Sequence, residues 1–228
     1  MTAINYEAGT IPQTNDPEEL DAAELAGKLS YRAHPYYLWR YGERGRRFTS
    51  SDSAWLVFLV TQSDGRIIQQ IDWLWSVLAN RGMPGLLLER HLLFLRSCLR
   101  RCSHRPQEVY DKITLATDYQ KARRLAVQTE DQLQQIATLF ANRLPVLPPR
   151  LAYGTGELLA SALADLRRGA PSAVSSLTSW LGDPDALRQA PGLVESLPDT
   201  LQSMVLCGDL DDAWRAAVME TVSEAKAA

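Results

Sequence analysis

The chain has 228 residues, a formal net charge of −3 and 46% hydrophobic residues, a balance typical of globular proteins. Its three cysteines follow no regular spacing. The composition therefore excludes a disulfide-built secreted scaffold and favours a reducing compartment. The longest apolar run, residues 55–60, is far shorter than the roughly 20 residues that span a bilayer. We expect a cytoplasmic protein without a secretory signal or membrane insertion.

The charge is unevenly distributed along the chain. Residues 29–128 contain 16 Lys/Arg and 8 Asp/Glu, a net charge of +8, whereas the remainder carries −11. The acidic ends can keep the chain soluble or fold back on the basic middle. Alternatively, the basic middle attracts an anionic ligand, a partner surface or nucleic acid.

Composition and prolines predict three regions. Residues 1–20 are polar and carry Pro12 and Pro17, which predicts a flexible acidic N-terminus. Residues 21–144 are expected to form the main helical bundle. Three prolines within residues 145–149 end any helix there. We therefore expect a boundary at this point, followed by a smaller helical C-terminal subdomain over residues 150–228.

The first part of the bundle contains an aromatic and arginine-rich connector. Residues 34–39 are rich in aromatic side chains, and residues 40–48 hold four arginines and two glycines. The following Thr49-Ser50-Ser51-Asp52 has the spacing of a capping box, which predicts that a helix begins at Ser53.

Two amphipathic helices follow with clear end signals. Ile67, Ile71, Leu74 and Leu78 form one stripe of a helix over residues 65–81, and Gly82 suits a left-handed C-terminal cap. The next helix, over residues 85–102, places its leucines on one face. We expect the apolar sides of the two helices to meet.

The rest of the chain is also predicted to be helical. Residues 106–144 form a long amphipathic segment that Thr129-Glu130-Asp131-Gln132 can divide by capping a new helix. Beyond Pro149, a helix is expected to start at Thr155. Shorter helices follow, separated by loops that contain Pro184, Pro191 and Pro198.

His91 is the main candidate cofactor ligand because it lies beside the apolar face of a predicted helix. One such histidine can ligate haem iron, and a tetrapyrrole also needs flat apolar walls and cations for its propionates. The residues expected to supply them are Trp55, Trp73, Trp75, Arg44 and Arg90. Cys98 and Cys102 could share a soft metal ion, but His91 lies about 10 Å from Cys98 along the helix axis and cannot join them. The alternative is that all these residues are ordinary core.

The arginines are candidate partner contacts. Arg beside aromatic rings can bind phosphates or stack on bases. No nucleic-acid-binding motif accompanies them, so we expect a protein partner at Arg44, Arg46, Arg47 and Arg100 and no nucleic acid. Signatures of nucleophilic, nucleotide-binding or di-iron enzymes are missing from the sequence, so we expect a non-catalytic protein.

Residues 41–48 (YGERGRRF), Asp52 and residues 73–84 (WLWSVLANRGMP) resemble helical regions of bacterial regulators. Those regions lie ahead of a cobalamin-binding domain or belong to globin-like sensory modules. Residues 163–177 are similar to the helical cap that covers cobalamin in such proteins. The chain lacks their Asp-x-His-x-x-Gly loop and a following parallel sheet. The resemblance therefore implies a sensory or interaction module rather than cobalamin binding.

We therefore predict an all-α helical bundle, with a globin-like arrangement as one form, and a smaller helical C-terminal extension. The predicted function is that of a regulatory domain, which binds a partner protein or a small hydrophobic ligand between the helices of residues 53–102 and 106–144. The alternative is a haem- or tetrapyrrole-binding protein with His91 as axial ligand.

Overall fold

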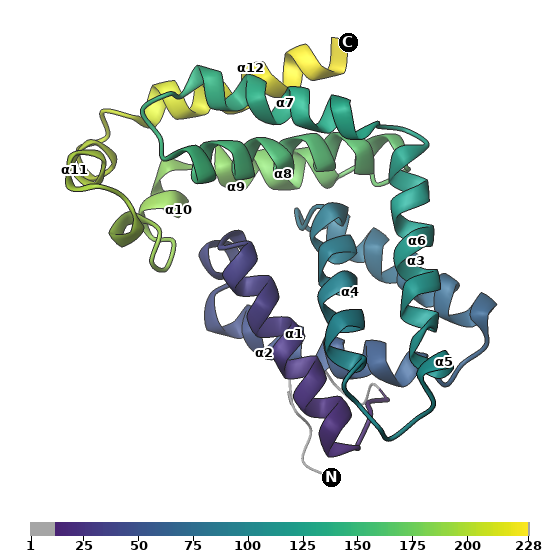
Figure 1. Ribbon diagram of the computed structural model, residues 1–228. Helices are drawn as coiled ribbons and strands as arrows, with labels where there is room; N and C mark the ends of the chain where they lie inside the picture. Colours follow the sequence, from purple (N-terminus) through teal and green to yellow (C-terminus); the bar gives the residue numbers. More distant parts are fainter. Residues whose placement is uncertain (1–11, 228) are drawn as a thin grey trace. The chain divides into compact units, whose positions relative to one another are not determined.

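The computed structural model describes residues 12–227, and every regular element in that range is helical (Figure 1). The predicted all-α fold is confirmed. None of the described helices is both long and apolar enough to cross a membrane. The elements are α1 (Pro17–Ala33), α2 (Tyr36–Leu59), α3 (Asp64–Asn80), α4 (Gly85–Leu99), α5 (Gln107–Tyr110), α6 (Lys112–Leu125), α7 (Glu130–Arg143), α8 (Pro149–Arg167), α9 (Ala173–Leu181), α10 (Pro184–Arg188), the 3₁₀ turn η2 (Val194–Ser196), α11 (Asp199–Cys207) and α12 (Asp211–Ala227).

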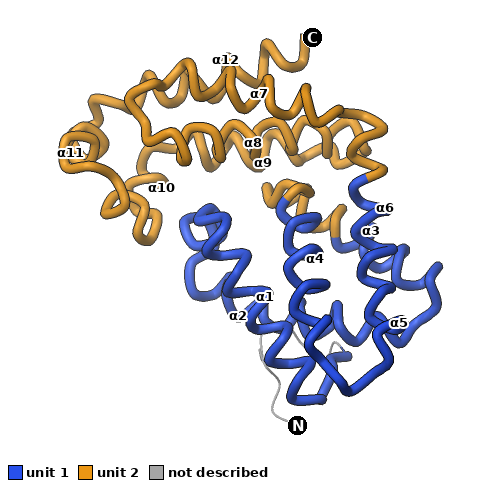
Figure 2. The backbone as a smooth tube through the Cα atoms, in the orientation of Figure 1, with its two compact units in different colours: residues 1–74, 87–121 blue, residues 75–86, 122–228 orange. Residues whose placement is uncertain are grey.

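The chain forms two compact units (Figure 2). Within the described range, unit 1 comprises residues 12–74 and 87–121, and unit 2 comprises residues 75–86 and 122–227. The divisions fall inside α3, α4 and α6 rather than in loops. The proline-rich segment does interrupt the helices, since residues 144–148 are non-helical between α7 and α8. However, they lie within unit 2 and are not a boundary between the two units.

The predicted flexible N-terminus is only partly described. Residues 1–11 lie outside the described range, but α1 already begins at Pro17. The Asp16 carboxylate caps this helix by accepting the backbone N–H of Glu19 at 3.1 Å. Residues 17–20 are therefore ordered helix, and the Glu19 side chain is fully buried.

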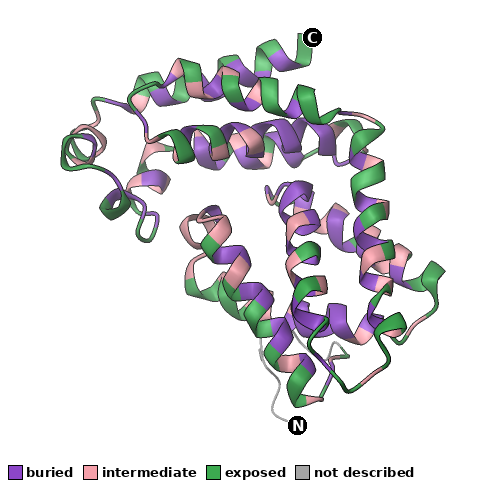
Figure 3. Ribbon diagram, in the orientation of Figure 1, coloured by how far each residue is buried: buried purple, intermediate pink, exposed green. Residues whose placement is uncertain are grey.

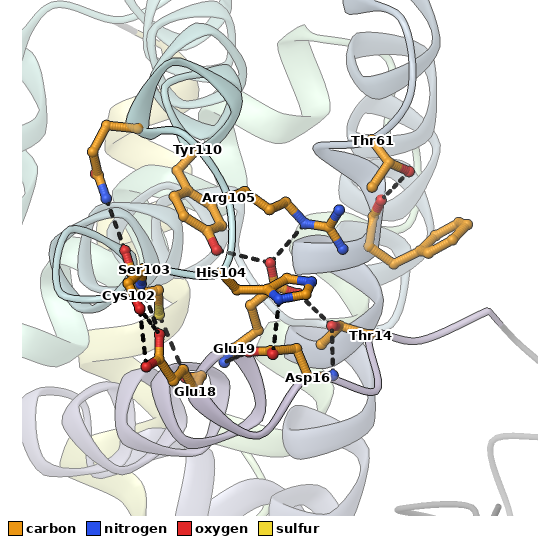
Figure 4. A network of polar contacts seen from close by, with 12 residues as sticks. Thr14, Asp16, Glu18, Glu19, Thr61, Cys102, Ser103, His104, Arg105 and Tyr110 are labelled. Carbon is orange, nitrogen blue, oxygen red and sulfur yellow. Dashed lines mark hydrogen bonds and ion pairs between the residues drawn. The ribbon is translucent and has the colours of Figure 1, made fainter.

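In unit 1, Glu19 is the centre of a buried polar network that Figure 4 shows. Its carboxylate accepts hydrogen bonds from Thr14 Oγ1, from Arg105 Nε at 2.7 Å and from Tyr110 Oη at 2.8 Å. A buried carboxylate needs such partners because it has lost its hydration. The network joins α1 to the segment that connects α4 with α5.

A second set of contacts in Figure 4 joins the same two segments closer to the surface. The Glu18 carboxylate accepts the backbone N–H of Ser103 at 2.7 Å, and this bond lowers the pKa of Glu18. His104 Nδ1 lies 3.0 Å from an Asp16 carboxylate oxygen. Cys102 is buried against the Glu18 carbonyl, and burial raises the pKa of its thiol to about 11.

Helix α2 corrects the prediction of a connector followed by a capped helix at Ser53. The helix runs from Tyr36 to Leu59 with one kink at Gly42, where φ is 55° and ψ is −152°. A positive φ of this kind is open to glycine without steric cost. Hydroxyls of the segment expected to cap a helix start instead bond backward within α2: Ser50 Oγ donates to the Arg46 carbonyl at 3.1 Å, and Ser51 Oγ donates to the Phe48 carbonyl at 2.9 Å. The capping-box spacing was misleading because a serine hydroxyl can also donate to a backbone carbonyl of the preceding turn inside a helix.

The two helices predicted over residues 65–81 and 85–102 are confirmed, although the second ends three residues earlier than predicted. Helix α3 spans Asp64–Asn80 and α4 spans Gly85–Leu99, and the side chains of Ile71 and Leu95 are fully buried. Gly82 has φ +80°, and the next N–H, of Met83, reaches the Leu78 carbonyl at 3.0 Å. This geometry is the predicted left-handed C-terminal cap.

The long amphipathic segment after Pro106 is divided as its cap predicts. Thr129 Oγ1 accepts the Gln132 N–H at 3.1 Å, and Gln132 Oε1 accepts the Thr129 N–H at 2.9 Å, a complete capping box. Helix α7 therefore starts anew at Glu130. Helix α8 begins at Pro149, six residues before the predicted start at Thr155.

Unit 2 is built around α8, which is buried along most of its length (Figure 3). It contacts α7, α9 and α12. Gly156 allows the close approach of α7, because a Cβ there would lie 2.6 Å from the Ala137 Cα and carbonyl oxygen. Phe140 of α7 is fully buried and meets the Trp214 ring of α12 edge to face at 5.8 Å.

Candidate functional site

His91 on α4 lies between two serine hydroxyls in unit 1. Its Nδ1 is 2.8 Å from Ser30 Oγ of α1, and its Nε2 is 3.0 Å from Ser53 Oγ of α2. Burial lowers the pKa of His91 to about 4, so the ring is neutral at neutral pH. A neutral imidazole has one donor and one acceptor nitrogen. One serine therefore donates to the ring while the other accepts from it, and His91 joins three helices.

This arrangement argues against the predicted ligand role of His91, because an iron ion would have to replace one of the two serines. The expected aromatic walls are also dispersed. Trp55 is buried and meets Trp73 edge to face at 6.1 Å, but 56% of Trp73 is exposed. Trp75 belongs to unit 2, where its indole N–H donates to Asp165.

Trp75 takes part in a buried polar cluster with Asp165 of α8. The Asp165 carboxylate accepts the Trp75 indole N–H at 2.8 Å and the backbone N–H of Gly85 at 2.6 Å. It thereby caps the N-terminus of α4. The guanidinium of Arg168 lies 4.0 Å from the centre of the Trp75 ring. Burial raises the pKa of Asp165 to about 6, against the lowering effect of these partners.

The predicted partner arginines lie mainly on α2, just after its kink. Arg44, Arg46 and Arg47 are exposed. Arg44 covers the Phe48 ring at 5.4 Å, and Arg46 covers the Tyr31 ring at 5.2 Å. Arg90 is partly buried on α4, and Arg100 is exposed just beyond its end. The surface of α2 suits an anionic partner, but the contact itself stays a prediction.

Unit 2 contains an apolar cavity that sequence reasoning did not find. Its volume is about 40 Å³, and it is partly open to solvent. Nine of its ten lining residues are apolar. They come from α8, α10, α11 and α12, from the turns before α8 and α12, and from the residues on either side of η2: Leu147, Leu151, Pro184, Leu187, Leu193, Leu197, Val205, Leu210 and Trp214, with Asp211 as the polar member.

Two interactions hold this cavity in shape. The Trp214 indole N–H donates to the Leu181 carbonyl at 2.7 Å, which fixes the ring that forms one wall. The Asp211 carboxylate accepts two hydrogen bonds from the Arg188 guanidinium, at 2.7 and 3.0 Å, and these raise the pKa of Arg188. Because the carboxylate is paired in this bidentate way, the polar member of the lining is already satisfied.

The cavity is absent from the sequence prediction because its residues have no shared period. They lie in short segments separated by Pro184, Pro191 and Pro198, and each segment contributes one or two apolar side chains. One feature of the sequence could have indicated the cavity: such short segments cannot bury an apolar face by themselves, so their apolar side chains must meet one another. The apolar site expected near His91 was assigned to the helices of residues 53–102 and 106–144, and this cavity lies elsewhere.

Comparisons with protein-family models, with curated proteins and with solved structures found no match to this chain. The resemblance to globin-like sensory regions therefore stays a prediction. The candidate site rests on its own geometry: an apolar cavity with a paired carboxylate at its edge.

Proposed function

We propose that this chain is a regulatory protein-interaction domain, in which the cavity of unit 2 receives an apolar side chain of a partner protein. The observation that carries the proposal is the cavity itself, which leaves nine apolar side chains around an unfilled and partly open space. An apolar group that enters such a space removes its own surface and that of the walls from water.

The size of the cavity favours a side chain over a cofactor. Pockets for drug-sized ligands and cofactors typically measure about 300–1,000 Å³, whereas this cavity measures about 40 Å³. A tetrapyrrole is far too large for it, but the end of a leucine side chain is comparable in size. Full burial of one such side chain contributes about 1.5–3 kcal/mol, enough to anchor a helix or peptide that makes further contacts.

The first prediction tests occupation of the cavity with N-acetyl-leucinamide, a mimic of one leucine of a partner. The chain has six tryptophans, and each gives one indole N–H signal in a nitrogen-15 correlation spectrum. We expect N-acetyl-leucinamide to shift the Trp214 signal, assigned with Trp214→Phe, because this ring lines the cavity. N-acetyl-alaninamide should shift it much less, since its methyl group leaves the space mostly empty.

Two neighbouring variants provide the control. Val205 lines the cavity, whereas the adjacent Leu206 is 60% exposed and is not part of the lining. Val205→Phe should fill the space and abolish the response, while Leu206→Phe adds the same ring outside and should preserve it. If Val205→Phe responds as strongly as the unaltered chain, the cavity is not the binding site and the proposed function is wrong.

A further inference from the structure

The segment that builds most of the cavity is strongly acidic. Residues 183–215 contain seven acidic and two basic residues, a net charge of −5, which exceeds the −3 of the whole chain. Eight of the ten lining residues come from this same segment. Apolar lining and negative charge therefore occur together along the chain.

The acidic residues alternate with the lining residues. Asp183 and Asp185 flank the lining residue Pro184, and both aspartates are exposed. Exposed Asp209 and the lining Asp211 flank Leu210 in the same way. The segment that supplies the apolar walls therefore also carries carboxylates directly beside the lining residues in the chain.

Further carboxylates follow the same pattern. Glu195 is exposed between the lining residues Leu193 and Leu197. Asp212 is fully exposed on α12, and because it lies two residues before the buried Trp214 it points away from the cavity wall and adds charge to the outer surface of the segment. Arg188 binds both Asp185, at 3.2 Å, and Asp211, so these two carboxylates lie around one guanidinium. The remaining basic residue of the segment, Arg215, pairs with Asp212 at 3.6 Å on the open surface.

We propose that the partner of this cavity is a positively charged amphipathic helix that inserts one apolar side chain and places Lys or Arg residues against the carboxylates of this acidic segment. This inference rests on the proposed function and adds the chemistry of the partner. An apolar centre with a charged rim is the usual arrangement of a specific interface. The net negative charge of the segment attracts a basic partner before contact and disfavours acidic partners and anionic lipid surfaces.

Three synthetic peptides of about 16 residues, long enough to form a helix, test this inference. The first combines lysines with one central leucine on its apolar face. The second replaces the lysines by glutamine, and the third replaces the central leucine by alanine. Fluorescence anisotropy of labelled peptides against the full chain measures each Kd at low and high salt. We expect the first peptide to bind most tightly, with an affinity that falls as salt screens the carboxylates.

Charge variants locate the basic contact. Glu195→Gln, Asp209→Asn and Asp212→Asn together should weaken binding of the first peptide about tenfold, since exposed charge pairs contribute little singly but add up. The matched control is Asp21→Asn, Glu24→Gln and Glu108→Gln, which removes three exposed carboxylates of unit 1 and changes the net charge equally. The control should retain nearly full affinity.

The outcomes separate the two proposals. If the glutamine peptide binds as tightly as the lysine peptide and shifts the Trp214 signal, the cavity binds apolar side chains but the inference of a basic partner is wrong. If the alanine peptide binds as tightly as the leucine peptide, the cavity is not used and both proposals fail. If the chain alone forms dimers that Val205→Phe dissociates in the analytical ultracentrifuge, the occupant is a second copy, which overturns the inference.

Discussion

At the residue scale, the clearest case is His91. The predicted position of this histidine on an inward-facing helix surface is confirmed, since only 6% of it is exposed. Its neighbours, however, are Ser30 and Ser53 rather than open space beside a row of tryptophans. A buried polar ring needs partners for both nitrogens. Two other helices supply these partners, from positions 61 and 38 residues away in the chain. A local sequence pattern cannot predict contacts between residues so far apart.

The second prediction concerns the pH dependence that His91 imposes on stability. Its pKa is about 4 in the folded protein against 6.5 for an ordinary histidine, so the unfolded chain binds the proton more readily. The contribution of His91 to folding is therefore complete above pH 6.5 and is lost as the pH falls toward 4, by about 3 kcal/mol in all.

Chemical denaturation of His91→Gln between neutral pH and pH 4 checks this prediction. Glutamine keeps a hydrogen-bonding side chain but does not titrate, so the variant should lose less stability on acidification than the unaltered protein. His104→Gln, which alters an exposed histidine near Asp16, should keep the loss that belongs to His91. Equal acid sensitivity in His91→Gln and the unaltered protein would contradict the argument.

At the scale of elements, helix ends were predicted well where one residue determines them. Gly82 ends α3 and the Thr129 box begins α7, because a positive φ and a reciprocal cap are local requirements. The start of α8 was placed too late: the helix begins at Pro149, where proline suits the first turn. Gly154 and Gly156 are both helical, and the structure gives the reason for one of them, the contact of Gly156 with α7.

The third prediction uses these two glycines. Gly156→Ala should destabilise the fold by about 1–3 kcal/mol, because the added Cβ would meet the Ala137 backbone at 2.6 Å and force α7 and α8 apart. Gly154→Ala, two residues earlier in the same helix, has open space around its Cβ and should stabilise the protein by up to about 1 kcal/mol. Thermal or urea unfolding followed by circular dichroism measures both. The same sign of effect in the two variants would disprove the close-packing argument.

At the scale of the whole molecule, the chain is divided by contact rather than by sequence order. Each unit takes residues from two stretches of chain, and α8 of unit 2 relies on residues 75–86 for the partners of Asp165. The C-terminal subdomain predicted over residues 150–228 lacks both these residues and α7, the helix against which Gly156 is packed.

The fourth prediction follows from this division. A fragment of residues 150–228 should not fold by itself, because α8 would lose the α7 face and Asp165 would lose Trp75 and Gly85. We expect its amide proton spectrum to be poorly dispersed, whereas the full chain should give the dispersed spectrum of a packed core. A well-dispersed spectrum of the fragment would show that residues 150–228 fold independently, and the proline-rich segment would then be a domain boundary.

The sequence by itself determined the helical class, most helix ends and which faces of α3 and α4 turn inward. These features depend on the spacing of residues within one or two helical turns, so a short stretch of sequence is enough to predict them. Only the tertiary structure decided that His91 is held by two serines, that Asp165 caps a distant helix and that Leu147 and Leu210 line the same cavity. Such contacts join residues tens of positions apart, and burial supplies their energy. Local sequence patterns predict which side chains are buried, but not which distant side chains they contact.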